Sequence, residues 1–261
     1  MKPIVELKDV TAGYGDEVVL KNVNLTIRAQ DFIGVIGPNG GGKTTLVKVI
    51  LGLIGTMNGK VVHHMDDNRE KGRHDIGYLP QVNRTDRRFP ITILDVVLSG
   101  LAGPKKFFNR FSKKDVQKAR NLLKKMGISH LERKNIGDLS GGQMQRVFLC
   151  RAIVSEPKLL ILDEPNTFVD NKFESDLYHI LKELNKKMAI MIISHDVGTI
   201  TYYVKTIACV NRELHYHESN VISEQQLAAY NCPIQIITHG EVPHTVLHQH
   251  EHSQDEINDP S

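Results

Sequence analysis

A glycine-rich stretch that directly follows a short apolar run constrains the fold of this chain most strongly. Residues 32–36 are uniformly apolar, as in a buried strand, and they lead straight into GPNGGGKT at residues 37–44. Apolar residues then recur at helical spacing, namely Leu46, Val49, Ile50 and Leu53, with Gly52 and Gly55 near the expected helix end. The order strand, glycine loop, helix predicts a layered α/β core with parallel strands.

The glycine stretch fits the phosphate-loop pattern GxxxxGK[ST]. In such a loop, backbone N–H groups surround phosphate oxygens and the following helix directs its positive dipole end at them. Glycine is needed because side chains would block that approach. The Lys43 ammonium would reach the terminal phosphates, and the Thr44 hydroxyl would bind Mg²⁺. The candidate nucleotide-binding residues are Gly37, Pro38, Asn39, Gly40, Gly41, Gly42, Lys43, Thr44 and Thr45. A surface glycine turn is the alternative, which the flanking strand and helix disfavour.

A second apolar run, LLILDE at residues 159–164, ends in two adjacent carboxylates. Its uniform apolarity predicts a central parallel strand, with Asp163 emerging at the end of the strand. There Asp163 would hold the Mg²⁺ shell, and Glu164 would act as general base on the attacking water. The alternative is a strand that ends in two solvated acids.

The third motif, LSGGQ at residues 139–143, lies between the other two. Ser140, Gly141, Gly142 and Gln143 open a predicted helix, so they form a second anion site at a helix N-terminus. This pentapeptide is rare by chance and is identified as the signature of the ABC (ATP-binding cassette) family. The chain resembles that family from Val5 to about Val210.

The resemblance implies a P-loop α/β core with a mainly helical signature subdomain and an antiparallel β subdomain. It places the ATP-binding domain at residues 1–237, with the helical subdomain at about 92–155. Residues 238–261 are expected to be a histidine-rich tail. The resemblance also implies a head-to-tail homodimer, in which each signature closes over ATP and Mg²⁺ held by the partner's phosphate loop.

Four further residues match positions of the family. Tyr14, in VTAGYGD, resembles the aromatic residue that stacks on adenine, although an ordinary turn tyrosine is the alternative. Gln81, in YLPQ, resembles the glutamine that senses Mg²⁺ and the γ-phosphate. His195, in IISHD, resembles the histidine that bonds the γ-phosphate, and with Glu164 and Gln81 it completes the catalytic set. Asp170 resembles the aspartate that communicates across the dimer, but its TFVD context departs from the usual SALD, so its local contacts stay open.

Charge and composition narrow the class of protein. The 33 basic and 30 acidic residues are interpreted as mixed along the chain, so the formal charge of +3 gives no support to nucleic acid as a partner. Three distant cysteines, Cys150, Cys209 and Cys232, suit reduced core thiols. The charged N-terminus is unlike a secretory signal, and no apolar run is long enough to span a membrane. The expected location is peripheral, on the cytoplasmic side of the cell (inner) membrane.

Three local stretches resemble the zinc/manganese-type metal importers within the family. They are GPNGGGKTT, RRFPITILDVVLSG and CPIQIITHGEVPHTVLHQHEH. The resemblance implies an integral-membrane permease as partner and, indirectly, an extracytoplasmic metal-binding protein. Arg87, Arg88, Phe89 and Pro90 would meet a cytoplasmic loop of the permease, unless they form a solvated basic turn.

Histidines gather at the C-terminal end, where five lie within fourteen residues. Imidazole suits zinc, so His239, His244, His248, His250 and His252 are candidate ligands. The alternative is a polar tail that binds no metal. At the level of the whole protein, the alternatives are an importer subunit for an iron chelate or haem and a non-transport ABC ATPase that acts on nucleic acid or ribosomes.

Overall fold

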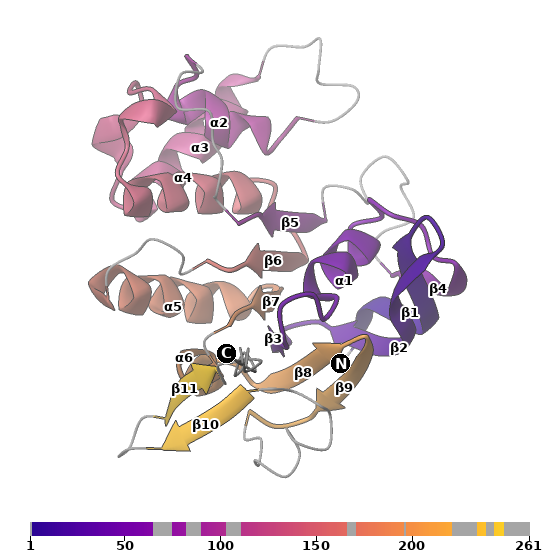
Figure 1. Cartoon of the computed structure of the whole chain (residues 1–261). Coiled ribbons are helices and arrows are strands. Elements are labelled where there is room, and N and C mark those ends of the chain that lie inside the picture. The colour runs from indigo at the N-terminus through magenta and orange to yellow at the C-terminus, as the bar shows by residue number, and fades with distance from the viewer. Residues whose placement is uncertain are drawn as a thin grey trace, which may run out of the picture.

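The computed structural model describes residues 2–64, 75–81, 90–102, 111–165, 171–195, 197–220, 234–238 and 243–247. Its centre is a six-stranded sheet in the order β5-β6-β7-β3-β8-β9 (Figure 1). The strands are β3 (Phe32–Ile36), β5 (Ile76–Leu79), β6 (Leu159–Asp163), β7 (Ala189–Ile193), β8 (Thr206–Asn211) and β9 (Glu213–His217). All neighbours pair in parallel except β8 with β9.

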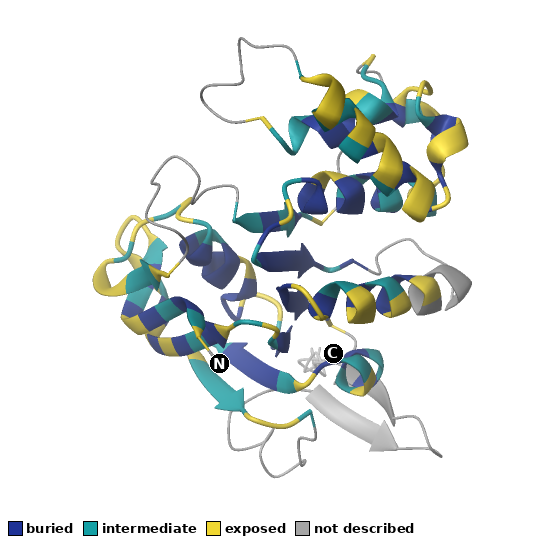
Figure 2. Cartoon of the chain, turned by 180° about the vertical axis from the view of Figure 1, so that it is seen from behind, coloured by how far each residue is buried: buried dark blue, intermediate teal, exposed yellow. Residues whose placement is uncertain are grey.

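Burial explains why the apolar runs become these strands. Every residue of β3, β6 and β7 is buried, as expected for parallel strands that are covered on both faces (Figure 2). The strands at residues 32–36 and 159–163, predicted from the sequence, are therefore confirmed.

A smaller antiparallel sheet lies beside this core. It contains β1 (Pro3–Tyr14), β2 (Glu17–Arg28) and β4 (Asn58–His63) in the order β2-β1-β4. Along β2 the buried residues Val23, Leu25 and Ile27 alternate with more exposed ones, so one face packs inward. The same hydrophobic cluster includes residues of helix α1 (Lys43–Ile50), which follows the glycine stretch. This sheet is the antiparallel β subdomain that the sequence predicted.

Helix α1 ends earlier than its apolar spacing predicted. It stops at Ile50, and Gly52 has a φ of 66°, a left-handed conformation that favours glycine and ends the helix. Leu53 therefore lies outside the helix and is 66% exposed, so its place in the helical spacing was wrong, whereas the predicted helix end near Gly52 is confirmed.

A helical layer covers the β5 edge of the central sheet (Figure 1). It contains α2 (Ile93–Ser99), α3 (Lys113–Lys125), the 3₁₀ turns η2 (Ser129–Leu131) and η3 (Ile136–Asp138), and α4 (Gly141–Ile153). Ser112 caps α3 in a reciprocal pair with Asp115, and Gly127 follows the helix with a φ of 71°. A Cβ at Gly100 would lie 2.1 Å from the carbonyl oxygen of Arg151, so glycine lets the chain after α2 contact α4 closely.

Two further helices, α5 (Asn171–Asn185) and α6 (Val197–Tyr203), follow β6 and β7 respectively along the chain. Strand β10 (Ile234–Thr238) pairs antiparallel with β11 (Pro243–Leu247), and β11 contacts α6. The sequence placed a tail from residue 238, and β11 is an ordered element within that range. Among the residues described, no helix is both long and apolar enough to cross a bilayer.

Candidate functional site

Four neighbouring parallel strands bring the candidate residues together at one edge of the sheet. Gln81 follows β5 closely, Asp163 ends β6, His195 follows β7, and the glycine loop at residues 37–42 follows β3. Since these strands are consecutive in the sheet and run parallel, their carboxyl ends meet. In open α/β sheets this edge is where ligands bind.

The glycine loop is organised around Lys43. Its Nζ donates to the carbonyl oxygens of Gly37 and Pro38, both at 2.8 Å, and the residue is only 6% exposed. The loop closes on itself through the Gly41 N–H, which donates to the Pro38 carbonyl at 3.1 Å. A buried ammonium enclosed by backbone carbonyls, at the N-terminus of α1, is a positive site suited to phosphate.

Two glycines show why side chains are excluded from this loop. Gly37 has a φ of 150°, and a Cβ there would lie 2.0 Å from the Val210 carbonyl oxygen. Gly42, the N-cap of α1, has a φ of 104°, and its Cβ would lie 2.6 Å from Leu20. Glycine therefore lets the loop pack closely against Val210 and Leu20, and the exposed Thr44 stands at the start of the helix. These features fit a triphosphate with its Mg²⁺.

Asp163 is a buried carboxylate at the end of β6, with an exposed fraction of 7%. Burial raises its pKa, and the negative charge of Glu164 adds to the rise. The Tyr78 hydroxyl donates to Asp163 Oδ2 at 3.3 Å, and the pKa of Tyr78 is raised to about 12, chiefly by burial. The sequence did not point to Tyr78, because an aromatic residue in a strand looks like a packing residue.

Glu164 lies between two of the candidate catalytic residues. Gln81 Nε2 donates to its Oε2, and His195 Nε2 contacts its Oε1. The backbone of Glu164 has a φ of 49°, and its N–H donates to the Ile193 carbonyl at 3.0 Å. The left-handed turn directs the chain away from β6 immediately after Asp163, so the two carboxylates occupy different positions. Glu164, Gln81 and His195 thus form one hydrogen-bonded group.

Tyr14 stands at the end of β1, with 46% of its surface exposed. Lys48 Nζ lies 3.1 Å from the Tyr14 hydroxyl oxygen but 5.2 Å from the ring centroid. The ammonium is therefore at the hydroxyl end of the side chain and not over the ring centre. The hydrogen bond from Lys48, followed by one from Thr45, lowers the pKa of Tyr14. The sequence did not predict Lys48 as a partner of Tyr14.

The signature residues form the N-terminus of α4. The Ser140 side chain accepts from the Gln143 N–H at 3.4 Å, and Gln143 Oε1 accepts from the Ser140 N–H at 3.1 Å. Ser140 and Gly141 are exposed. Helix α4 packs on α2 and β5, whereas α1 packs on β1 and β2, so the signature and the phosphate loop belong to different parts of one subunit (Figure 1).

Several predicted residues fall outside the described part of the chain. These are Arg87, Arg88, Phe89, Asp170, His239, His248, His250 and His252. Pro90 is described and precedes α2. For His244 only the backbone is described, in β11, where it pairs with Ile237. Cys150 and Cys209 are buried in the core, and Cys232 lies outside the described residues.

The fold and this edge of the sheet define the chain as a nucleotide-hydrolysing enzyme of the P-loop class. The sequence profile of the ABC transporter family matches residues 20–167. The chain therefore belongs to the ABC transporter family, and it is an ATP-binding, ATP-hydrolysing subunit of that family.

Relatives and a solved structure agree with this assignment. The chain is 41% identical to a probable metal transport system ATP-binding protein of Thermotoga maritima, over 82% of this chain and 84% of the relative. It is 37% identical to the zinc uptake system ATP-binding protein ZurA of Listeria monocytogenes and 36% identical to the manganese transport system ATP-binding protein MntB of Halalkalibacterium halodurans, each over 82% of this chain and 85% of the relative. A dimeric structure of a bacterial ABC transporter cassette has a TM-score of 0.68 at 27% identity, covering 84% of this chain and all of the other.

Proposed function

We propose that this chain is the ATPase subunit of an importer for a divalent metal ion, with zinc favoured over manganese. One observation carries the proposal: relatives that share more than a third of their residues with four fifths of this chain are named for metal, zinc or manganese transport. The histidine-rich end of the chain supports zinc, because imidazole is a common zinc ligand.

The residues at the sheet edge divide the work of ATP hydrolysis. Lys43 and the backbone of the glycine loop bind the phosphates, while Thr44, Gln81 and Asp163 would hold Mg²⁺. Bound Mg²⁺ would offset charge on the phosphates. Glu164 accepts the proton of the attacking water, and Gln81 and His195 orient its carboxylate through the contacts described above. The products are ADP and phosphate.

Each subunit carries a phosphate loop and a signature, and we call these two half-sites because an ATP site needs one of each. The working unit is therefore a homodimer. The exposed Ser140 and Gly141 lie on the helical layer, remote along the sheet from the chain's own phosphate loop. A head-to-tail pair would place them over the partner's ATP, together with Gly142 and Gln143. The existence of a dimeric ABC cassette with the same fold supports this arrangement. Asp170 would communicate between the two subunits across the dimer interface.

The proposal places the dimer against a membrane permease, on the cytoplasmic face of the inner membrane. Importer subunits of this family work with membrane-embedded partners, and the stretch that includes Pro90 is expected to meet one of them. An extracytoplasmic metal-binding protein would deliver the ion to the other side of the permease. Nucleic acid has no part in this function.

The zinc-binding role of the C-terminal histidines stays a prediction. Strands β10 and β11 pair so that Thr238 is opposite Pro243 and Ile237 is opposite His244. His239 therefore directly follows β10, and His248 directly follows β11. A truncation after residue 247 preserves both strands and removes His248, His250 and His252, so it is the variant to use in a zinc titration.

Metal uptake by cells that lack this gene tests the cargo. Cells would carry either the wild-type gene or the Lys43→Ala variant, and total zinc and manganese would be measured at limiting supply of each metal. We expect the wild-type gene alone to restore zinc uptake, because the variant lacks the ammonium that binds phosphate. Restoration of manganese uptake alone would identify manganese as the cargo. Restoration of neither zinc nor manganese uptake would contradict metal import.

A further inference from the structure

Positive charge concentrates in the outer part of the helical layer. Residues 111–134 contain eight basic and two acidic residues, a net charge of +6 in a chain whose total is +3. The rest of the chain therefore carries a net −3. This segregation corrects the expectation that charges are evenly mixed, which total composition alone had suggested.

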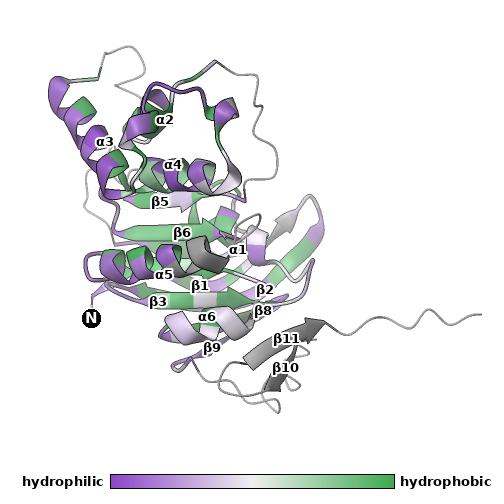
Figure 3. Cartoon of the chain, turned by 90° about the vertical axis from the view of Figure 1, so that its left-hand side faces the viewer, coloured by the Kyte–Doolittle hydropathy of each residue, from purple (hydrophilic) through white to green (hydrophobic). Residues whose placement is uncertain are grey.

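The basic residues of α3 share one face. Lys113 and Lys124 are eleven residues apart, as are Lys114 and Lys125, and this spacing returns to the same side of a helix after three turns. All four are exposed, whereas Ala119 and Leu123 on the opposite side are fully buried. In Figure 3 the ribbon of α3 lies on the outside of the helical layer and is coloured mostly hydrophilic.

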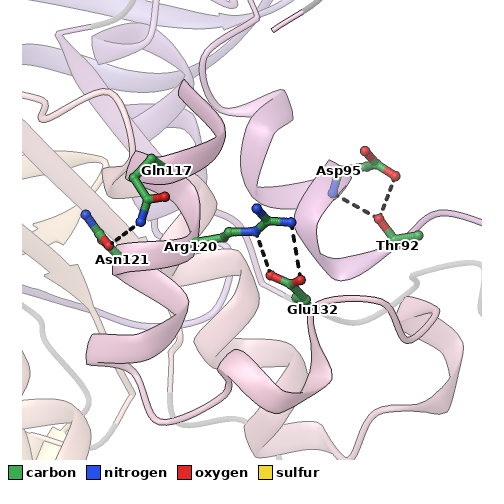
Figure 4. Close-up of polar contacts among 6 residues, drawn as sticks. All are labelled: Thr92, Asp95, Gln117, Arg120, Asn121 and Glu132. Carbon is green, nitrogen blue, oxygen red and sulfur yellow. Dashed lines mark hydrogen bonds and ion pairs between the residues drawn. The ribbon is translucent and has the colours of Figure 1, made fainter. Parts of the chain in front are cut away.

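Both acidic residues of this segment are already engaged. Asp115 Oδ2 accepts from the Ser112 N–H at 3.0 Å, and Glu132 accepts from Arg120 Nε at 3.0 Å (Figure 4). The Arg120–Glu132 pair joins α3 to the turn that carries Arg133 and Lys134. Of the eight cations in residues 111–134, six make no ion pair with the described part of the chain: Lys113, Lys114, Lys124, Lys125, Arg133 and Lys134. We call these six residues the α3 basic face.

Helix stability does not explain the whole of this face. Lys124 and Lys125 lie in the last turn of α3, where cations interact favourably with the helix dipole. Lys113 and Lys114 lie in the first turn, where the positive end of the helix dipole makes a positive charge unfavourable. Charges that oppose local stability and form no ion pair are available to an external anionic partner.

The position of the face indicates which partner. The Ile93 N–H donates to the Lys134 carbonyl at 3.0 Å, and Thr92 pairs with Asn135, so the face adjoins the start of α2. Pro90, in the stretch expected to meet the permease, directly precedes this point. A permease fixes whatever docks on it close to the bilayer. Anionic headgroups attract each Lys or Arg that lies near the membrane surface.

We propose that the α3 basic face binds anionic lipid headgroups of the membrane beside the permease. The contact would hold the outer helical layer at the bilayer and add to the affinity of the subunit for its transporter. It rests on the proposed membrane location but not on the identity of the metal. Permease-stimulated ATPase activity in detergent tests that location separately.

Sedimentation of the full-length protein with vesicles tests the proposal. The vesicles contain phosphatidylcholine alone or phosphatidylcholine mixed with phosphatidylglycerol. The face variant replaces Lys113, Lys114, Lys124 and Lys125 by Gln, and a matched control replaces the exposed Lys2, Lys21, Lys60 and Lys187 by Gln. Both variants lose four charges, so net charge alone cannot separate them. We expect wild type and control to bind the anionic vesicles and the face variant to bind at least about ten-fold more weakly.

Three results would overturn the proposal: equal wild-type binding to neutral vesicles, equal loss in the two variants, or binding to RNA in preference to anionic vesicles. High salt should weaken the wild-type binding, because exposed charges are screened. ATP hydrolysis without permease should be unchanged in both variants, since neither set lies at the nucleotide site. If the face variant does not fold, the same four lysines are replaced by Arg, which keeps the charge. This variant should bind anionic vesicles like wild type and lose that binding at high salt.

Discussion

Glu164 is the side chain on which the proposed hydrolysis depends most directly. Its carboxylate is contacted by Gln81 and His195 and lies partly buried at the strand ends, where a γ-phosphate would bind. Glu164→Gln keeps the shape but cannot accept a proton from water. We expect the rate of ATP hydrolysis to fall about 10²–10⁴-fold while ATP affinity stays within about three-fold of wild type, measured by steady-state phosphate release and equilibrium nucleotide binding.

The matched control for this substitution is Glu183→Gln. Glu183 is exposed on α5 and pairs with Lys186 at 2.7 Å, so its loss should leave the rate unchanged. A Glu164→Gln protein that hydrolyses ATP as fast as wild type would transfer the role of general base to another group, with His195 the next candidate.

Asp163 carries a cost to stability, which fits its proposed role in binding Mg²⁺. Burial raises its pKa, so the ionised form is disfavoured in the folded state, and the cost grows as pH rises through the folded-state pKa. Asp163→Asn keeps an acceptor for Tyr78 and removes the charge. We expect its Tm without nucleotide to exceed that of wild type by a few degrees at neutral pH, on the order of 1 kcal/mol.

The pH dependence tests that explanation. The gap in Tm should shrink as pH falls through the raised folded-state pKa of Asp163, because wild-type Asp163 then becomes protonated. Asp176→Asn serves as the control, since Asp176 is mostly exposed and pairs with Arg146, and it should give no gain. A Tm for Asp163→Asn at or below wild type at neutral pH would mean that the charge stabilises the fold.

Tyr14 separates the contribution of a ring from that of a hydroxyl. Stacking on a base is worth about 1–3 kcal/mol, so Tyr14→Ala should weaken ATP binding about five- to 150-fold. Tyr14→Phe keeps the ring and loses the bond from Lys48, and it should retain most of the affinity. Fluorescent nucleotide titration measures both, with Tyr202→Ala on the exposed surface of α6 as control. Equal losses in the Phe and Ala variants would assign the affinity to the hydroxyl.

At the scale of elements, uniform apolar runs and capping residues were the reliable signals. The runs at β3 and β6 and the Ser112 cap of α3 needed no tertiary information, because burial and end-capping are local properties of the sequence. The prediction that Leu53 belongs to helix α1 failed, because the left-handed Gly52 stops the helix although the apolar spacing continues beyond it. The contact of Tyr78 with Asp163 could not be predicted, since it joins residues far apart in the sequence across two strands.

Asn185 shows how one side chain fixes an element to the sheet. It ends α5, is 5% exposed, and its Nδ2 donates to the carbonyls of Gln30, Asp31 and Met188 at 3.2, 2.8 and 3.1 Å. Asn185→Leu removes this donor from all three carbonyls, of which Gln30 O still accepts from Lys205 Nζ and Asp31 O from the Ile190 N–H. We expect the free energy of unfolding to fall by about 1–3 kcal/mol, measured by denaturant titration.

Asn121→Leu is the control for that loss. Asn121 is exposed on α3, where its Oδ1 accepts a hydrogen bond from Gln117 Nε2 (Figure 4), so the change should stay within about 0.5 kcal/mol. Equal effects at the two positions would show that the three carbonyls gain nothing from Asn185.

At the scale of the whole molecule, the sequence predicted the class of protein and the residues gathered at the sheet edge. It did not predict how charge is distributed over the surface. Motif residues are recognisable because phosphate chemistry restricts them to few residue types, and their strands are neighbours in the sheet. The α3 basic face escaped notice because a total charge of +3 hides a segment of +6. Charge becomes informative only when the fold shows which residues share a face.

Two half-sites in each subunit predict that inactive subunits can restore each other. Ser140→Arg blocks the signature at the start of α4, and Lys43→Ala removes the ammonium from the phosphate loop. In a mixed dimer both defects fall on one composite site, so the other site is intact. We therefore expect a mixture to regain up to about a quarter of wild-type ATPase activity when dimers form at random, since half of the dimers are mixed and each has one intact site. Phosphate release from each variant alone and from the mixture measures this. No recovery in a preparation shown to contain mixed dimers would mean that both sites must act together or that the head-to-tail dimer is wrong.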